Sequence, residues 1–118
     1  MKLYAFNWEK HEHKIETEEI RLRNRIDALV MGDEEYLGAA AVHDFNSKSR
    51  ADQERILTYL QRLADRIAEV RGKAEDNVRI GKYGTLVAFV DGVTYGALMK
   101  IVTNYCARIP ANMVHFVA

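Results

Sequence analysis

The spacing of apolar residues predicts a long amphipathic helix over residues 50–71. Apolar side chains recur there at intervals of four and three, the period of a helix with one buried face: Ile56, Leu60, Leu63, Ile67 and Val70. Ser49 and Asp52 resemble a capping box at its start, and Gly72 predicts its end. We expect the five apolar residues to pack in the core.

Two further apolar residues, Leu57 and Ala64, widen the stripe of this predicted helix. The stripe covers only two heptads, fewer than a free-standing coiled coil needs, so packing within the chain must supply most of the burial. A wide stripe can also serve a second copy of the chain across a two-fold axis. We therefore predict that a homodimer would use the flank around Leu57 and Ala64.

The N-terminal part of the chain shows a different pattern. Leu3–Trp8 is rich in aromatic residues and predicts a strand, and the polar residues Glu9–Lys14 follow it. Over Ile15–Met31 the apolar residues keep helical spacing, and the Glu19–Arg23 pair lies one turn apart. Apolar residues also alternate with arginines over residues 20–26, so an amphipathic strand stays open as the alternative.

Local signals predict two short connections before the long helix. Gly32 is a candidate C-cap for the helix that precedes it. Asp33 is a candidate N-cap for a short helix that continues to Ala41, with acidic residues in its first turn. Residues His43–Lys48 predict a loop.

The pattern changes from helical to strand-like spacing after the long helix. Val78–Ile80 and Leu86–Val90 predict two strands, with the glycine-flanked loop Gly81–Gly84 between them. Asp91-Gly92 is a hairpin dipeptide and predicts a returning strand at Val93–Tyr95. The same dipeptide can instead lead a strand into a helix.

Helical spacing returns over residues 97–108, and Pro110 is expected to end that helix. Met113–Val117 then predicts a final strand. Together the patterns predict a single α+β domain over residues 1–118. Its small sheet, mostly antiparallel or mixed, would pack against two or three helices.

The charge balance and the single cysteine narrow the possible functions. The 118 residues include 17 Lys and Arg and 17 Asp and Glu, which argues against broad electrostatic attraction to nucleic acid or acidic membranes. Cys106 alone forms no intrachain disulfide and no cysteine-based zinc site. The chain shows neither a signal-peptide pattern nor an apolar run of membrane-spanning length, so we expect a cytoplasmic protein without membrane contact.

Candidate chemistry is sparse. Glu9, His11 and His13 would share one face of an extended segment and then suit a divalent metal, whereas in a helix they would diverge. A solvated polar segment is the simpler interpretation, and Cys106 has the setting of a packed thiol. No nucleophile lies in a recognisable catalytic motif. We therefore predict no catalytic residues, no metal and no cofactor, and favour a protein that is not an enzyme.

The loop Gly81-Lys82-Tyr83-Gly84 resembles the GxxG loop of KH domains, whose backbone grips a nucleic-acid strand. The resemblance implies nucleic-acid binding, to which Arg79 and Lys82 would contribute. A KH loop leads into a helix, whereas residues 85–92 predict a strand and a turn. A glycine-permitted turn between two strands is the alternative.

Residues 87–117 resemble the strand–turn–helix–strand unit of the ExbD/TolR periplasmic domain, through Asp91, Val93, Tyr95 and Gly96. A helix also precedes that unit in the family. The resemblance implies a small α+β fold that can dimerise. It implies no motor activity, because the family's motor needs an N-terminal transmembrane helix with an aspartate, for which this chain shows no pattern.

These observations favour a small protein-binding module, an adaptor or inhibitor that acts by direct contact with another protein. Trp8 and Tyr83, together with Lys82, are the expected contact residues, because exposed aromatic side chains make interface anchors. Nucleic-acid binding through the Gly81–Gly84 loop is the first alternative. A small enzyme with its site at a subunit interface is the second.

Overall fold

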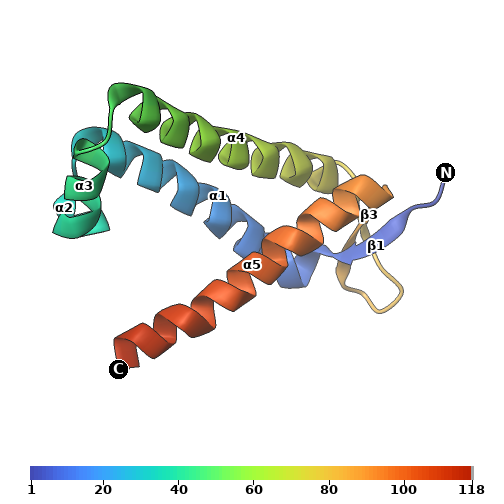
Figure 1. The fold of residues 1–118 in the computed structure, drawn as a ribbon. Coiled ribbons are helices and arrows are strands. Elements are labelled where there is room, and N and C mark those ends of the chain that lie inside the picture. The colour runs from blue at the N-terminus through green and yellow to red at the C-terminus, as the bar shows by residue number, and fades with distance from the viewer. Residues whose placement is uncertain (118) are drawn as a thin grey trace. The chain divides into compact units, whose positions relative to one another are not determined.

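The computed structural model describes the backbone of residues 1–117 and the side chains of residues 1–104. The elements follow one another as β1 (Tyr4–Asn7), α1 (Trp8–Met31), α2 (Glu34–Leu37), α3 (Ala39–Asn46), α4 (Arg50–Glu75), β2 (Val78–Ile80), β3 (Leu86–Val90) and α5 (Gly92–Val117) (Figure 1). The three strands form one antiparallel sheet, and the remaining elements are helices. The predicted α+β class is confirmed.

The chain forms two compact units. The sheet unit comprises Met1–Glu18 and Ile67–Ala118, and the helical unit comprises Glu19–Arg66. Helices α1 and α4 each run from one unit into the other without a break. The single-domain prediction stays a prediction.

The sheet has the strand order β1-β3-β2, and its register separates a covered face from an open one. Phe6 and Val78 both lie opposite Ala88, so these residues share a face. Phe6 and Ala88 on this face are buried. Tyr95 of α5 lies against it, with its ring centre 6.2 Å from that of Phe6 and the two rings nearly perpendicular. Helix α5 therefore covers this face.

Helix α1 begins immediately after β1, seven residues before the predicted start at Ile15. The side-chain oxygen Oδ1 of Asn7 accepts a hydrogen bond from the Lys10 backbone N–H at 3.0 Å, which caps the helix. The polar segment Glu9–Lys14 is thus helical. The helical interpretation of the following residues is confirmed and the strand alternative is excluded.

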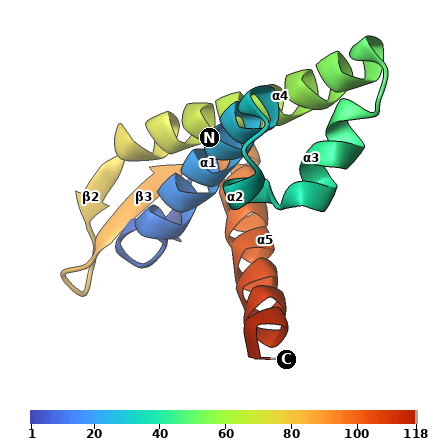
Figure 2. The same ribbon diagram turned by 90° about the vertical axis from the view of Figure 1, so that its left-hand side faces the viewer.

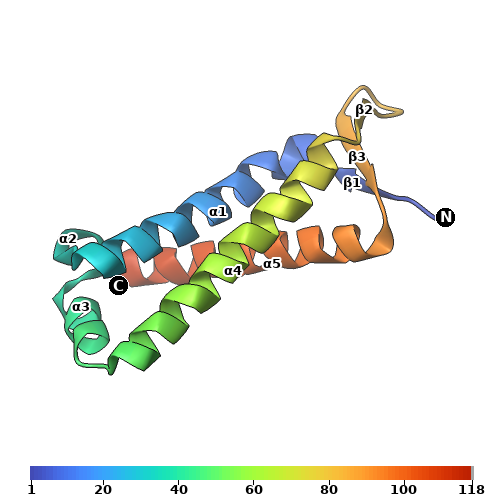
Figure 3. The same ribbon diagram turned by 90° about the horizontal axis from the view of Figure 1, so that it is seen from above.

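Local caps in the helical unit match their predictions. The Asp33 carboxylate accepts a hydrogen bond from the Tyr36 N–H at 3.1 Å and starts α2. The Ser49 hydroxyl oxygen accepts one from the Asp52 N–H at 3.1 Å and starts α4. Helices α2 and α3 connect the end of α1 to the start of α4 (Figure 3). The predicted loop at His43–Lys48 is wrong over residues 43–46, because α3 continues to Asn46.

An arginine joins α1 to α4 within the helical unit. Arg23 Nε donates to the Glu19 carboxylate at 2.9 Å, which confirms the predicted pair one turn apart. Its Nη2 lies 3.4 Å from the Asp65 carboxylate of α4. The hydrogen bond that Arg23 donates to Glu19 is the main reason why the pKa of Arg23 lies above its ordinary value. These contacts place Arg23 and Asp65 on the sides of the two helices that face each other.

The end of β3 leads into a helix and not into a hairpin. The Asp91 carboxylate accepts hydrogen bonds from the Thr94 backbone N–H at 2.7 Å and from the Thr94 hydroxyl at 3.1 Å. The backbone hydrogen bond is the main reason why the pKa of Asp91 lies below its ordinary value. This cap explains why α5 begins at Gly92, and the predicted strand at Val93–Tyr95 is wrong.

Helix α5 continues through Pro110 to Val117, so the predicted final strand at Met113–Val117 is wrong as well. A proline removes one backbone N–H donor from a helix interior. The proline ring also crowds the carbonyl four residues earlier, so the total cost is about 3 kcal/mol or more. The other backbone hydrogen bonds of this helix of 26 residues offset that cost. The three strands of the described backbone also form a complete sheet without this segment.

Candidate protein-binding surface

The buried side of α4 differs from the predicted one at the helix centre. Ala64 is fully buried, whereas Leu63, which was predicted to lie in the core, is 38% exposed. Ile67 and Val70 are buried as predicted. Ala64 has no exposed surface with which to contact a second copy, so its assignment to a dimer interface is wrong. Its small side chain instead fits the crowded inner side of the helix.

Leu57 lines a groove in the helical unit, which we call the α4 groove. The groove has a volume of about 310 Å³ and lies where α1, α3 and α4 meet. Its apolar lining includes Leu29 and Phe45, which are buried, and Leu57, which is half-buried. Arg50 and Glu54 are among its polar lining residues. The groove thus combines apolar and polar contacts, as protein interfaces and ligand sites do.

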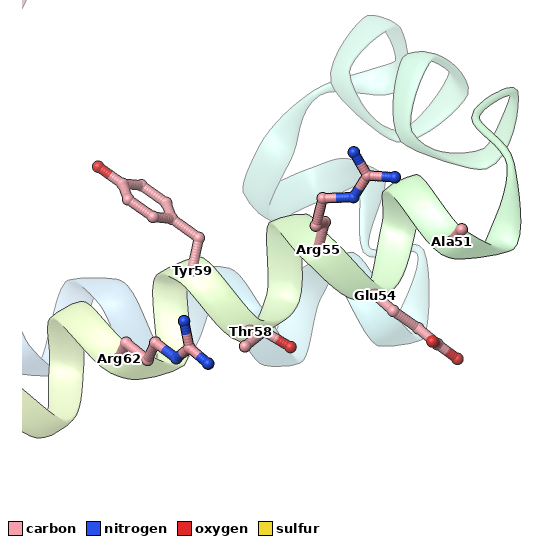
Figure 4. Close-up of a pocket in the computed structure, with 6 residues that line it drawn as sticks. All are labelled: Ala51, Glu54, Arg55, Thr58, Tyr59 and Arg62. Atoms are coloured by element: carbon pink, nitrogen blue, oxygen red, sulfur yellow. The ribbon is translucent and has the colours of Figure 1, made fainter.

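Helix α4 presents a second surface, the Tyr59 face, which comprises Arg55, Tyr59 and Arg62. The spacing of four and three residues places these side chains on one stripe of the helix. Tyr59 is 63% exposed and extends away from the helix axis (Figure 4). A depression of about 500 Å³ lies along this stripe, and Glu54 lines both this depression and the α4 groove. The two features therefore adjoin on the N-terminal half of α4.

The charges around these features are exposed and only weakly paired. Arg55 Nη2 lies 3.2 Å from the Asp52 carboxylate, and Arg50 Nε lies 3.6 Å from that of Glu54. Ion pairs this exposed contribute about 0–1 kcal/mol each, so a partner can replace them at little cost. Arg62 makes neither a hydrogen bond nor an ion pair with any side chain in the described range 1–104. Arginine guanidinium groups are thus available on both sides of Tyr59.

The three residues predicted to contact a partner fall in different environments. Trp8 is 3% exposed, and its ring centre lies 6.5 Å from that of Phe6. Its assignment as an exposed anchor is wrong, because the first turn of α1 directs its ring into the core. Lys82 and Tyr83 lie in the loop between β2 and β3. Figure 2 shows the hairpin that these two strands form. Both residues are exposed, so their role in binding stays a prediction.

Sequence reasoning missed Tyr59 as a contact residue although a signal was present. Arg55 and Arg62 lie outside the apolar stripe of this helix, and Tyr59 lies between them at helical spacing. An aromatic residue on the polar side of an amphipathic helix has no place in the core of its own chain. That pattern marks a candidate interface residue.

The polar residues at the start of α1 do not gather into a metal site. Residues two apart on a helix point in different directions, and the contacts of Glu9 and His13 are separate. The Glu9 carboxylate accepts a hydrogen bond from the Leu86 N–H at 3.4 Å, whereas His13 Nε2 lies 3.5 Å from the Thr17 hydroxyl. Within the described part of the chain, no three metal-ligating side chains cluster.

His11 is a partly buried histidine beside the core. Its ring centre lies 5.2 Å from that of Phe6, and its Nδ1 atom is buried without a hydrogen-bond partner in the structure. Burial is the main reason why the pKa of His11 lies below its ordinary value of 6.5, and Lys14 and Lys10 lower it further. The uncharged imidazole is therefore the form that suits this position.

Comparisons of the chain with protein-family models, curated proteins and solved structures gave no match. The resemblance of residues 87–117 to the ExbD/TolR unit therefore stays a prediction. The helices that the structure describes include none with the length and apolarity to cross a bilayer. Cys106 belongs to the residues whose side chains are not described.

Proposed function

We propose that this chain is a protein-binding module without catalytic activity, and that residues 50–63 of α4 form its binding surface. One observation carries the proposal: the α4 groove and the Tyr59 face adjoin at Glu54. A partner that covers this stretch of helix gains an apolar pocket and an exposed aromatic side chain in one continuous contact. Direct contact of this kind suits an adaptor or an inhibitor.

The residue types on this surface support a protein partner. Tyrosine and arginine are enriched among the residues whose removal weakens protein complexes most. The acidic residues Asp52 and Glu54 lie beside Arg50 and Arg55, so the surface has mixed charge. A nucleic-acid backbone favours a surface with a positive excess, and these carboxylates would repel it.

The charge pattern favours a different protein over a second copy at this surface. Arg55 and Arg62 lie almost symmetrically about Tyr59 along the helix. A two-fold antiparallel pairing of α4 with itself, centred there, would place Arg55 opposite Arg62 of the other copy. Like charges in an interface cost free energy, whereas carboxylates of another protein would pair with both arginines.

A photo-crosslinking experiment in the native host tests the proposal. The photoreactive amino acid p-benzoylphenylalanine is placed at Tyr59, and in a control variant at Tyr36, which is 50% exposed on α2 of the same unit. We expect a discrete crosslinked protein from position 59 that position 36 does not yield. The reversal Arg62→Glu should weaken binding of the purified partner by about tenfold or more. Equal crosslinking at both positions, or unchanged affinity of the reversal, would contradict the proposal.

A further inference from the structure

The sheet carries a second surface, on the side opposite α5. Ala5 of β1 lies opposite Phe89 of β3, and Arg79 of β2 lies opposite Val87 of β3. These four residues share one face by alternation. Ala5, Arg79 and Phe89 are exposed and Val87 is half-buried. We call these residues the open sheet face.

We propose that the open sheet face binds single-stranded nucleic acid, with a base stacked on Phe89 and phosphates held by the basic residues of the sheet. The proposal does not depend on the α4 surface, with which this face shares no residue. Stacking on an aromatic ring does not depend on base identity, so binding without strong sequence preference is expected. A duplex would hide its bases from Phe89.

The register leaves room for a base above Phe89. Its neighbour on β1 is Ala5, whose methyl group does not shield the ring. Phe89 is 36% exposed, although it lies in the central strand of the sheet. Arg79 lies diagonally across from it, at the roughly 7–8 Å typical of such neighbours, within reach of the phosphate of a stacked nucleotide.

The hairpin formed by β2 and β3 has a positive excess that the neutral whole chain conceals. The segment Asn77–Val90 contains Arg79 and Lys82 and no acidic residue. Lys2 does not belong to this face, because its ammonium lies 5.2 Å from the centre of the Tyr4 ring on the covered face. Arg79 uses Nη1 to donate to the carbonyl of its neighbour Val78 at 2.8 Å, which leaves further N–H groups for a phosphate. A run of phosphates can pair with more than one of these cations at once. Charge complementarity therefore favours a polyanion over a protein segment, which would also need an apolar anchor of its own.

Asp91 and Glu9, which follow β3 and β1 in sequence, both use their carboxylates in hydrogen bonds to the backbone. The Asp91 carboxylate accepts the hydrogen bonds from Thr94 that cap α5. The Glu9 carboxylate accepts a hydrogen bond from the Leu86 N–H.

The hairpin tip extends this surface. Tyr83 is 84% exposed, and the Lys82 ammonium lies 5.7 Å from the centre of its ring. An exposed aromatic ring beside a cation offers a second stacking position next to a phosphate contact. The Gly81–Gly84 loop connects two strands and does not lead into a helix, so the alternative of a turn between strands is confirmed and the KH resemblance is wrong. The proposal therefore depends on the exposed side chains of this loop and of the open sheet face.

Fluorescence anisotropy with labelled oligothymidine and oligouridine tests the proposal on the full chain. The two cations Arg79 and Lys82 predict that log K falls with log salt at a slope of about −1.4, since each phosphate contact on a single strand contributes about −0.7. Arg79→Ala should reduce the slope to about −0.7, and the double variant Arg79→Ala/Lys82→Ala should remove most of the salt dependence. Phe89→Ala should weaken binding about fivefold to a hundredfold, the range for losing one stacked base.

Matched variants separate stacking from folding and from simple apolar contact. Phe89→Tyr keeps an aromatic ring and should bind like the wild type, whereas Phe89→Leu keeps the apolar volume and should bind like Phe89→Ala. Tyr36→Ala, in the helical unit, should leave binding unchanged. Three results would overturn the proposal: a Kd above the roughly 10⁻⁴ M limit of non-specific binding at low salt, full binding by Phe89→Leu, or protection of this face by a bound protein and not by the oligonucleotides.

Discussion

Truncating two leucines tests which side of the structure is the core. Leu98 of α5 is 0% exposed, and Leu63 of α4 is 38% exposed. Leu98→Ala leaves a closed cavity and should lower the free energy of unfolding by about 3–5 kcal/mol, the upper part of the range for such changes. Leu63→Ala loses only part of its transfer free energy and leaves a space that water enters, so about 1–1.5 kcal/mol is expected.

Urea unfolding followed by circular dichroism measures both values, and equal m-values show that the unfolded states are comparable. The expected difference of about 1.5–4 kcal/mol corresponds to a difference of at least several degrees in Tm for a domain of this size. The amphipathic pattern alone predicted Leu63 as core. Equal losses for the two variants would restore that interpretation and refute the position of α4 derived from the structure.

Three other changes have definite expected outcomes. Gly81→Ala would place a Cβ atom 2.8 Å from the Val87 side chain and should destabilise the protein by about 1–3 kcal/mol in urea unfolding. The Cβ atom of Gly72→Ala would meet no atom within 4 Å, so this change should stabilise α4 by about 0.5–1 kcal/mol. Ser49→Ala removes the cap of α4 and should cost about 0.5–2 kcal/mol in the same assay, whereas no loss would show that the cap is unimportant. The lowered pKa of His11 means that the unfolded chain binds a proton more readily than the folded chain does. The contribution of His11 to the free energy of unfolding is therefore complete above pH 6.5 and declines as the pH falls toward the folded-state pKa. His11→Gln should reduce the change in the free energy of unfolding between these two pH limits, and an unchanged profile would contradict the assignment.

The parts of the fold that the sequence predicted are those with local causes. The caps at Asp33 and Ser49 depend on a side chain and a backbone N–H three residues later, and both formed as predicted. The strands β2 and β3 were recognised from short runs that glycines separate. In each case the decisive contact lies within a few residues of its signal.

The parts that the sequence missed depend on distant contacts. The polar turn Glu9–Lys14 has no apolar stripe of its own, and its helical state follows from the Asn7 cap and from the burial of Trp8 and Ile15 on either side. Position 63 or 64 fits the α4 period equally well, because either lies three or four residues from its apolar neighbours. Only the packed structure identifies which of the two faces inward.

The same reasoning explains why neither proposed surface was found from the sequence. Phe89 lies in an apolar run that predicts a buried strand. Only the strand register shows that Phe89 lies on the open face of the sheet. Tyr59 lies within a helix whose apolar stripe drew attention to the opposite side. Whether an aromatic residue is exposed depends on the assembled fold. A sequence shows it only where the aromatic residue lies outside the apolar stripe that the helical or strand period predicts.

The two proposed surfaces make a joint prediction that neither makes alone. They share no residue and lie in different compact units, and substitutions at sites without shared partners usually have independent effects. Phe89→Leu should therefore weaken oligonucleotide binding and leave crosslinking from position 59 unchanged, whereas Arg62→Glu should do the reverse. Loss of both activities in either variant, with the circular dichroism spectrum of the wild type retained, would show that one partner spans both surfaces. Such a result would refute the separation of a protein-binding α4 from a nucleic-acid-binding sheet.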